Sequence, residues 1–163
     1  MSMAEVFVLL GGNTGDRKEI LRKASGHLEK RAGHITCKSS IYETEPWGFT
    51  SDTAFLNQAM CLHTLLSPRE ILTVILQIEK EMGRQRIGKS YASRPIDIDI
   101  LFYEHLVNNE PDLVIPHPRL HLRKFSLIPL NEIAGSFIHP VLQKTIETLL
   151  KECKDTLKVV KYL

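Results

Sequence analysis

The sequence predicts an α+β fold with a ferredoxin-like β-α-β-β-α-β core, in which helices cover one face of a largely antiparallel sheet and a C-terminal extension follows. Two observations predict it. Segments with the apolar or alternating patterns of strands occur in the order of that motif, and segments with helical spacing occur in the two places where it needs helices. A chain of 163 residues, 43% of them hydrophobic, is also long enough to bury one core. We therefore expect a single domain over residues 1–163.

The first half of the chain supplies a strand, a helix and two strands. Residues 6–10 are an apolar run that ends in a Gly-Gly-Asn turn, and residues 17–31 have helical spacing after a capping Thr or Asp. Residues 35–42 and 55–65 are rich in β-branched or apolar side chains and are predicted strands. The segment between these two strands contains proline and glycine and is a predicted loop.

The second half begins with a helix at Ser67-Pro68, where proline occupies the first helical position. A polar, basic segment without periodicity follows that helix, and its length of about twelve residues is near the limit at which structureless connections become suspect or functional. The remaining predicted elements are a strand over 96–103, a segment at 106–107 that pairs back onto it, a helix over 125–134, a short tail helix and an edge strand over 157–162.

Charge and composition exclude several classes of protein. The formal net charge of +2 is too small for a protein that coats nucleic acid or a membrane surface. No apolar run approaches the length of a membrane span. The three cysteines are odd in number and widely spaced, which favours reduced thiols. We therefore expect no nucleic-acid partner, no membrane partner, and a cytoplasmic location.

Alternate acidic residues mark the strand at 96–103. Asp97 and Asp99 are two positions apart, so in a strand they project from one face with Cα atoms about 6.5–7 Å apart, while isoleucines fill the other face. Two carboxylates this close repel each other unless a cation lies between them. Such oxygen ligands suit Mg²⁺ that is shared with substrate phosphates. The alternative is an amphipathic strand whose polar face lies in water.

Basic residues on both sides of this strand favour the metal interpretation. The preceding loop carries Arg84, Arg86 and Arg94, and the following segment carries His117 and Arg123. Arginine near paired carboxylates is what a metal–polyphosphate site needs. The loop itself has two interpretations, a lid that brings arginine to phosphate or a solvated connector.

A match to the phosphate-binding pattern G-x-x-x-x-G-K-[ST] at residues 83–90 is misleading. That motif binds phosphate where it follows a strand and opens a helix, because the backbone amides and the helix dipole then face the ligand. Here a predicted helix precedes the pattern, and Pro95 with the Ile-Asp alternation follows it. We therefore do not predict a P-loop.

Four segments, taken together and in this order, closely resemble the 6-hydroxymethyl-7,8-dihydropterin pyrophosphokinase family of folate biosynthesis. They are Y-E-T-E-P-W-G at 42–48, F-L-N at 55–57, R-P-I-D-I-D-I at 94–100 and P-H-P-R at 116–119. The resemblance runs over residues 6–134. It implies transfer of the terminal diphosphate of ATP to the pterin hydroxymethyl group, with release of AMP and the use of two Mg²⁺ ions. It also allows other folate-pathway enzymes as partners.

The resemblance further implies a role for each matching residue. It places the metal ions on Asp97 and Asp99. The residues implied in catalysis at the phosphates are Arg84, Arg94, His117 and Arg123. The residues implied in nucleotide binding are Glu79, Arg86, Tyr91, Ile100, His117 and Arg123. The residues implied in pterin binding are Thr44, Glu45, Trp47, Phe55, Asn57, Tyr91 and Phe125. The pterin is a flat, polar two-ring system. Aromatic side chains can stack on its faces, and a side-chain amide can both donate and accept hydrogen bonds at its edge.

Two other classes of function remain open at this point. A ferredoxin-like RNA-binding module would need exposed aromatic side chains on the sheet and a basic surface. A metal-dependent phosphohydrolase would release phosphate from ATP with no acceptor present. The first is disfavoured by the near-neutral charge and the carboxylate pair.

Overall fold

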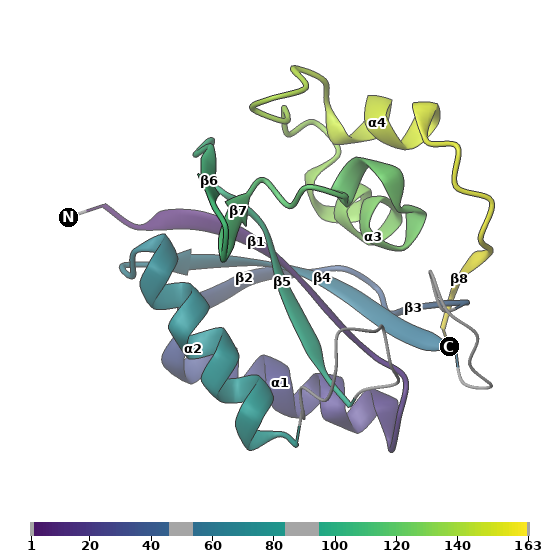
Figure 1. Ribbon diagram of the computed structural model, residues 1–163. Coiled ribbons are helices and arrows are strands. Elements are labelled where there is room, and N and C mark those ends of the chain that lie inside the picture. Colours follow the sequence, from purple (N-terminus) through teal and green to yellow (C-terminus); the bar gives the residue numbers. More distant parts are fainter. Residues whose placement is uncertain (1, 46–53, 84–94, 163) are drawn as a thin grey trace.

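The computed structural model describes residues 2–45, 54–83 and 95–162. The strands build a main sheet and a short hairpin, and helices cover both faces of the main sheet (Figure 1). The elements are β1 (Ala4–Gly12), α1 (Arg17–Arg31), β2 (His34–Lys38), β3 (Tyr42–Thr44), β4 (Phe55–Thr64), α2 (Pro68–Glu81), β5 (Asp97–Tyr103), β6 (Asn108–Glu110), β7 (Leu113–Ile115), η1 (Leu120–Leu122), α3 (Lys124–Ala134), α4 (Ile146–Glu152) and β8 (Val159–Lys161).

The main sheet has the strand order β5-β1-β4-β3-β8, and β2 pairs with the part of β4 that β3 leaves free. All of these pairings are antiparallel. The central strand β1 lies between β4 and β5, so β5 is an edge strand. The ferredoxin-like antiparallel core predicted from the sequence is confirmed.

Two hydrophobic clusters lie on opposite faces of the sheet. The first joins α1 and α2 to the sheet through side chains such as Leu28, Ile75 and Ile98. The second joins α3 and α4 to the other face through side chains such as Leu130 and Ile146. The predicted helix layer is therefore α1 with α2, and the C-terminal extension supplies the second layer (Figure 1). The predicted tail helix and edge strand are α4 and β8, which pairs with β3.

Local sequence signals explain where helices begin. Ser67 caps α2, its side chain accepting the backbone N–H of Glu70 while the Glu70 carboxylate accepts the backbone N–H of Ser67. Asp16 caps α1 by accepting the N–H of Glu19. Within the described parts of the chain, no helix combines the length and apolar character that crossing a bilayer requires.

The predicted strand over 35–42 is in fact two strands, β2 and β3, separated at Ser39. The Ser39 backbone N–H donates to the carbonyl of Ala59, and the Ser39 hydroxyl accepts the N–H of Ala59, at 2.9 Å each. A side chain thus replaces a ladder hydrogen bond, and the chain can change direction there. The predicted turn at Gly11-Gly12 is also wrong, because both glycines belong to β1.

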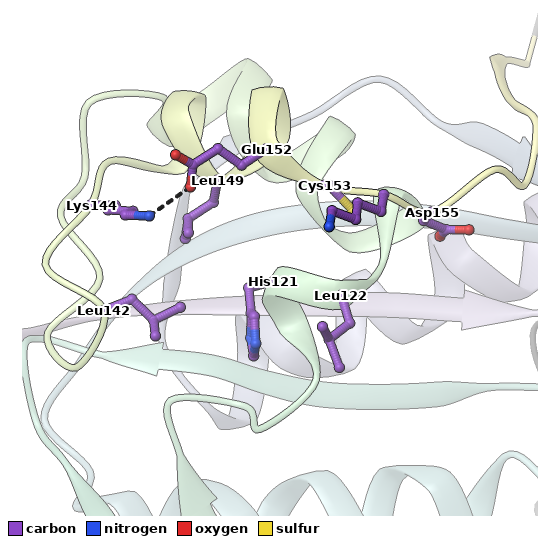
Figure 2. A pocket seen from close by; sticks show the side chains of 9 residues that line it. His121, Leu122, Leu142, Lys144, Leu149, Glu152, Cys153 and Asp155 are labelled. Atoms are coloured by element: carbon purple, nitrogen blue, oxygen red, sulfur yellow. Dashed lines mark hydrogen bonds and ion pairs between the residues drawn. The ribbon is translucent and has the colours of Figure 1, made fainter.

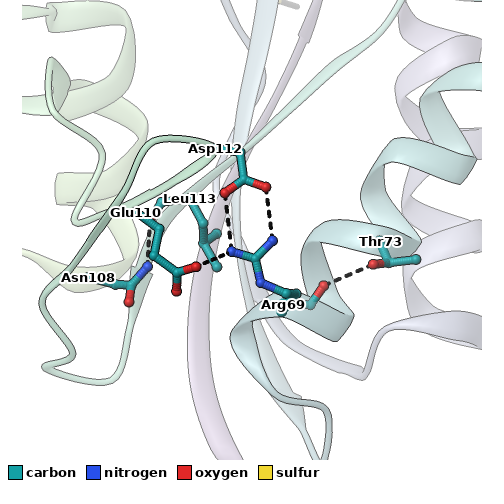
Figure 3. Close-up of polar contacts among 6 residues, drawn as sticks. All are labelled: Arg69, Thr73, Asn108, Glu110, Asp112 and Leu113. Atoms are coloured by element: carbon teal, nitrogen blue, oxygen red, sulfur yellow. Dashed lines mark hydrogen bonds and ion pairs between the residues drawn. The ribbon is translucent and has the colours of Figure 1, made fainter.

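The segment at 106–107 does not form the predicted strand; a hairpin of β6 and β7 forms just beyond it. Arg69 of α2 holds this hairpin (Figure 3). Its guanidinium donates two hydrogen bonds to the carboxylate of Asp112, at 2.9 and 3.1 Å, and one to Glu110. The Asn108 side-chain amide closes the hairpin by donating to the carbonyl of Leu113 at 2.6 Å.

Candidate functional site

Asp97 and Asp99 of β5 project from one face of the sheet, and Ile98 and Ile100 project from the other. Ile98 and Ile100 are buried against the α1–α2 layer, whereas Asp97 and Asp99 are partly exposed. The Asp99 side chain retains 29% of its accessible surface. The strand period therefore brings both carboxylates to one face beside the open edge of the sheet.

A cleft of about 210 Å³ runs along this edge, between α2, β5 and the hairpin β6–β7. Among the residues with an implied nucleotide role, Glu79, Ile100 and His117 line it together with Asp97 and Asp99. The opposite wall contains Leu113 and its neighbours from the hairpin, together with apolar side chains of α2. The lining of the cleft thus combines apolar side chains with carboxylates.

Glu79 supports the backbone between the two aspartates. Its side chain is almost fully buried, with 3% exposure, and its carboxylate accepts the N–H of Ile98 at 2.8 Å. A buried carboxylate is stable where it receives hydrogen bonds from the backbone. Glu79 therefore fixes the edge strand at the residue that separates Asp97 from Asp99.

His117 faces Asp99 as a neutral imidazole. Burial, and then the positive charge of nearby Arg123, lowers the pKa of His117 to about 4. Its Nδ1 accepts the backbone N–H of Arg119 at 3.1 Å, which assigns the proton of the neutral ring to Nε2. This Nε2 lies 4.0 Å from Oδ2 of Asp99, beyond hydrogen-bond distance, so at neutral pH the two form no ion pair. The ring presents an N–H donor to the cleft.

Arg123 and Phe125 come from the start of α3. Arg123 is 8% exposed, and its guanidinium carbon lies 5.3 Å from the centroid of the Phe125 ring. This distance is within the range of a cation–π contact. The stacked pair places a fixed positive charge close to His117 and an aromatic ring beside it.

The implied pterin residues on the sheet lie next to the carboxylates. Asn57 of β4 and Asp97 of β5 are both in register with Gly11 of β1, so one row across the sheet runs Asp97–Gly11–Asn57. Asp97 and Asn57, at the two ends of the row, are two strand spacings apart, about 10 Å. Phe55 lies two positions from Asn57 on the same face and pairs with Thr44 of β3.

This row depends on the absence of a side chain at Gly11. A Cβ at Gly11 would come closer than 3.0 Å to Oδ1 of Asn57 and within 3.4 Å of its Cγ. Asn57 is 4% exposed and has little room to retreat. Sequence reasoning treated this glycine as part of a turn and missed its role; two glycines at the end of an apolar run were the available signal.

The remaining predicted residues divide into two groups. Glu45 is exposed directly after β3, and Thr44 is buried, with its hydroxyl donating to the carbonyl of Lys158 at 3.1 Å. Five predicted residues lie outside the described part of the chain: Trp47, Arg84, Arg86, Tyr91 and Arg94. The geometry of the described residues alone defines the site above.

A larger hollow of about 540 Å³ lies between η1 and α4 (Figure 2). Leu122, Leu142 and Leu149 line it, and Lys144 pairs with Glu152 at its rim, 2.7 Å between Nζ and Oε1. None of the described residues with an implied site role lines it. The smaller cleft is therefore the candidate site, because it contains the carboxylates and the neutral imidazole.

Comparison with known families identifies the family of this chain. The model of the 7,8-dihydro-6-hydroxymethylpterin-pyrophosphokinase family matches residues 7–135. The chain belongs to this family. The matched region includes every described residue with an implied site role, from Thr44 to Phe125. The family expected from the four sequence segments is therefore confirmed.

Curated relatives carry the same family name. A 2-amino-4-hydroxy-6-hydroxymethyldihydropteridine pyrophosphokinase of Porphyromonas gingivalis is 42% identical over 141 residues, which cover 85% of this chain and 95% of that protein. One from Aquifex aeolicus is 40% identical and covers 96% of this chain and 95% of that protein. A Pisum sativum protein named folate synthesis bifunctional protein, mitochondrial, is 41% identical over 82% of this chain and only 26% of its own length.

Solved structures agree on the fold of this chain. A crystal structure of a Plasmodium falciparum HPPK-DHPS triple mutant superposes with a TM-score of 0.74 and covers 92% of this chain. This chain spans 44% of that longer one, and the two are 22% identical. At this identity the likeness shows the shared fold alone.

Proposed function

We propose that this chain transfers the terminal diphosphate of ATP to the hydroxyl of 6-hydroxymethyl-7,8-dihydropterin, giving AMP and the pterin diphosphate, in folate biosynthesis. The observation that carries the proposal is the row Asp97–Gly11–Asn57, which sets a carboxylate pair about 10 Å from a buried amide on one face of the sheet. Family membership supports the same reaction.

ATP occupies the cleft at the edge of β5 in this proposal. Ile100 and Leu113 provide apolar surface for the base, and His117 donates its Nε2–H toward the phosphates. The pterin lies over β4, where Asn57 recognises its amide-like edge and the rings of Phe55 and Phe125 flank its face. The acceptor hydroxyl then points along the row toward Asp97.

Two Mg²⁺ ions belong to the proposal, and the residues present fit them. Asp97 and Asp99 offer paired, partly exposed carboxylate oxygens, the ligand type that Mg²⁺ prefers when it shares phosphate oxygens. When bound, the ions neutralise phosphate charge and orient the chain of phosphates. His117 is outside this ligand set, because its Nε2 carries a proton.

The reaction needs no covalent intermediate. The pterin hydroxyl oxygen forms a bond to the β-phosphorus, the bond from that phosphorus to the α–β bridging oxygen breaks, AMP leaves with the electron pair, and the hydroxyl proton passes to solvent. Negative charge grows on the bridging oxygen as this happens. Arg123 and the His117 N–H are placed to stabilise it, because such transfers depend mainly on positioning and electrostatics. Arg84, Arg86 and Arg94 complete the proposed phosphate-binding set.

The proposal treats residues 1–163 as one pyrophosphokinase domain that works in the cytoplasm, where its three cysteines stay reduced. Other folate-pathway enzymes remain its candidate partners, because a relative carrying this region is named a bifunctional folate synthesis protein. The pairing of β8 with β3 supports one domain, since the C-terminal segment joins the same sheet.

The decisive experiment is mass-resolved product analysis with ATP, Mg²⁺ and the pterin alcohol. AMP and pterin diphosphate should appear together, and neither should form without the acceptor. Phosphate release from ATP alone would instead indicate a phosphohydrolase, and an RNA-binding module would give no product at all. Asp97→Ala should abolish turnover and keep the fold, whereas Glu19→Ala, which removes an exposed carboxylate from α1, should leave turnover unchanged.

A further inference from the structure

A second group of metal-ligating side chains lies at the other end of the sheet. Glu5 of β1 and His63 of β4 are direct cross-strand partners, and Cys61 is two positions before His63. One ligand atom from each of these three residues, here called the β1–β4 cluster, lies within 4.8 Å of the other two. Glu5 is six positions along β1 from Gly11, about 20 Å, so the cluster is remote from the Asp97 cleft.

The cluster has a buried thiol and two half-exposed partners. Residues opposite or two apart on paired strands share a face, which places all three side chains on the α3–α4 side. Cys61 is 4% exposed and packs into the second hydrophobic cluster, whereas the side chains of Glu5 and His63 each retain 42% exposure. An ion could therefore enter from solvent and reach the sulfur.

Within the cluster, the distance between His63 and Glu5 matches a coordination sphere better than a direct hydrogen-bonded pair. His63 Nε2 and Glu5 Oε2 are 3.7 Å apart, too far for a hydrogen bond. Ligands at about 2.0–2.3 Å from a tetrahedral ion lie about 3.3–3.8 Å from one another. Burial, with a contribution from the Glu5 carboxylate, raises the pKa of the Cys61 thiol to about 11, so without a cation the sulfur stays protonated.

We propose that Glu5, Cys61 and His63 bind a divalent cation of the zinc class, with Cys37 of β2 as the fourth ligand. Sulfur, imidazole and carboxylate together select zinc over magnesium, which avoids thiolate. Cys37 is the register partner of Cys61, so its side chain is on the same face and within reach of the site after rotation about χ1. Binding releases the thiol protons of Cys61 and Cys37 to solvent and links three strands through one ion.

The test uses Co²⁺ as a spectroscopic probe of the full chain, stripped with a chelator and kept under a non-thiol reductant, with excess Mg²⁺ present. We expect one Co²⁺ per chain, a sulfur-to-cobalt charge-transfer band, and displacement of that band by Zn²⁺. Cys61→Ser should weaken the band, because Cys37 is then the one thiolate left in the proposed ligand set. The matched control Cys153→Ser, which removes the thiol at the end of α4, should leave it unchanged.

Two further variants keep the test decisive if Cys61→Ser does not fold. His63→Gln and Glu5→Gln alter half-exposed side chains, and each should weaken Co²⁺ binding at least about tenfold, as loss of a ligand requires. Zn²⁺ should raise the Tm of the unaltered chain and not that of His63→Gln. Absence of the charge-transfer band in the unaltered chain, or equal affinity in His63→Gln, overturns the site. Pyrophosphokinase activity is not the readout, so failure of one proposal leaves the other standing.

Discussion

Gly11→Ala tests the row on which the proposed reaction depends. The three atoms nearest to the added Cβ all belong to Asn57 or Leu56, so the methyl group displaces the Asn57 amide and leaves Asp97 in place. Overpacking of a filled site costs about 1–3 kcal/mol of stability. Misplacing an amide that hydrogen-bonds a buried ligand costs about 1–3 kcal/mol in binding, which is about 5- to 150-fold in kcat/KM for the pterin.

The assay is steady-state kinetics with each substrate varied in turn, combined with thermal unfolding. KM for ATP should change less than about threefold, because the cleft lies on the far side of β1. Gly26→Ala is the matched control: Gly26 is exposed in α1, and a Cβ there meets no atom within 4 Å. That control should gain about 0.5–1 kcal/mol of stability and keep its kinetics. A folded Gly11→Ala enzyme with unchanged kcat/KM for the pterin would refute the reasoning.

Three further predictions concern the supports of the site and the extension. Arg69→Ala frees the hairpin wall of the cleft. KM for ATP should rise about threefold with kcat unchanged, and Tm should change little, because these ion pairs are half-exposed; a kcat loss instead would contradict this. Glu79→Ala removes the acceptor of the Ile98 N–H and should lower both Tm and kcat, whereas Glu79→Gln, which retains an acceptor, should recover most of the Tm. Burial lowers the pKa of His139, whose Nδ1 accepts two backbone N–H groups, so stability should fall as pH drops below the unfolded value of about 6.5. His139→Asn keeps an acceptor and cannot titrate, so its Tm should fall less than that of the unaltered chain between about pH 7.5 and about pH 5; equal slopes would exclude His139 as the cause.

Several parts of the fold were predictable because local interactions decide them. The Ser67 capping box and Pro68 define the start of α2, and both are visible as letters of the sequence. The alternation around Ile98 places the aspartates opposite the isoleucines, since a strand has a period of two. The errors arose where long-range pairing overrides local preference, as at Ser39, where a contact with Ala59 divides one expected strand into two.

The sequence by itself determined the family, the order of the core elements and the shared face of Asp97 and Asp99, because motif letters and strand periodicity are local properties. Only the tertiary structure decided that Gly11 makes room for Asn57, that Glu79 holds the N–H of Ile98, and that Glu5 meets Cys61 and His63. Each of these contacts joins residues that are far apart in the chain. Antiparallel register and helix packing set such distances, and neither can be read from one segment alone.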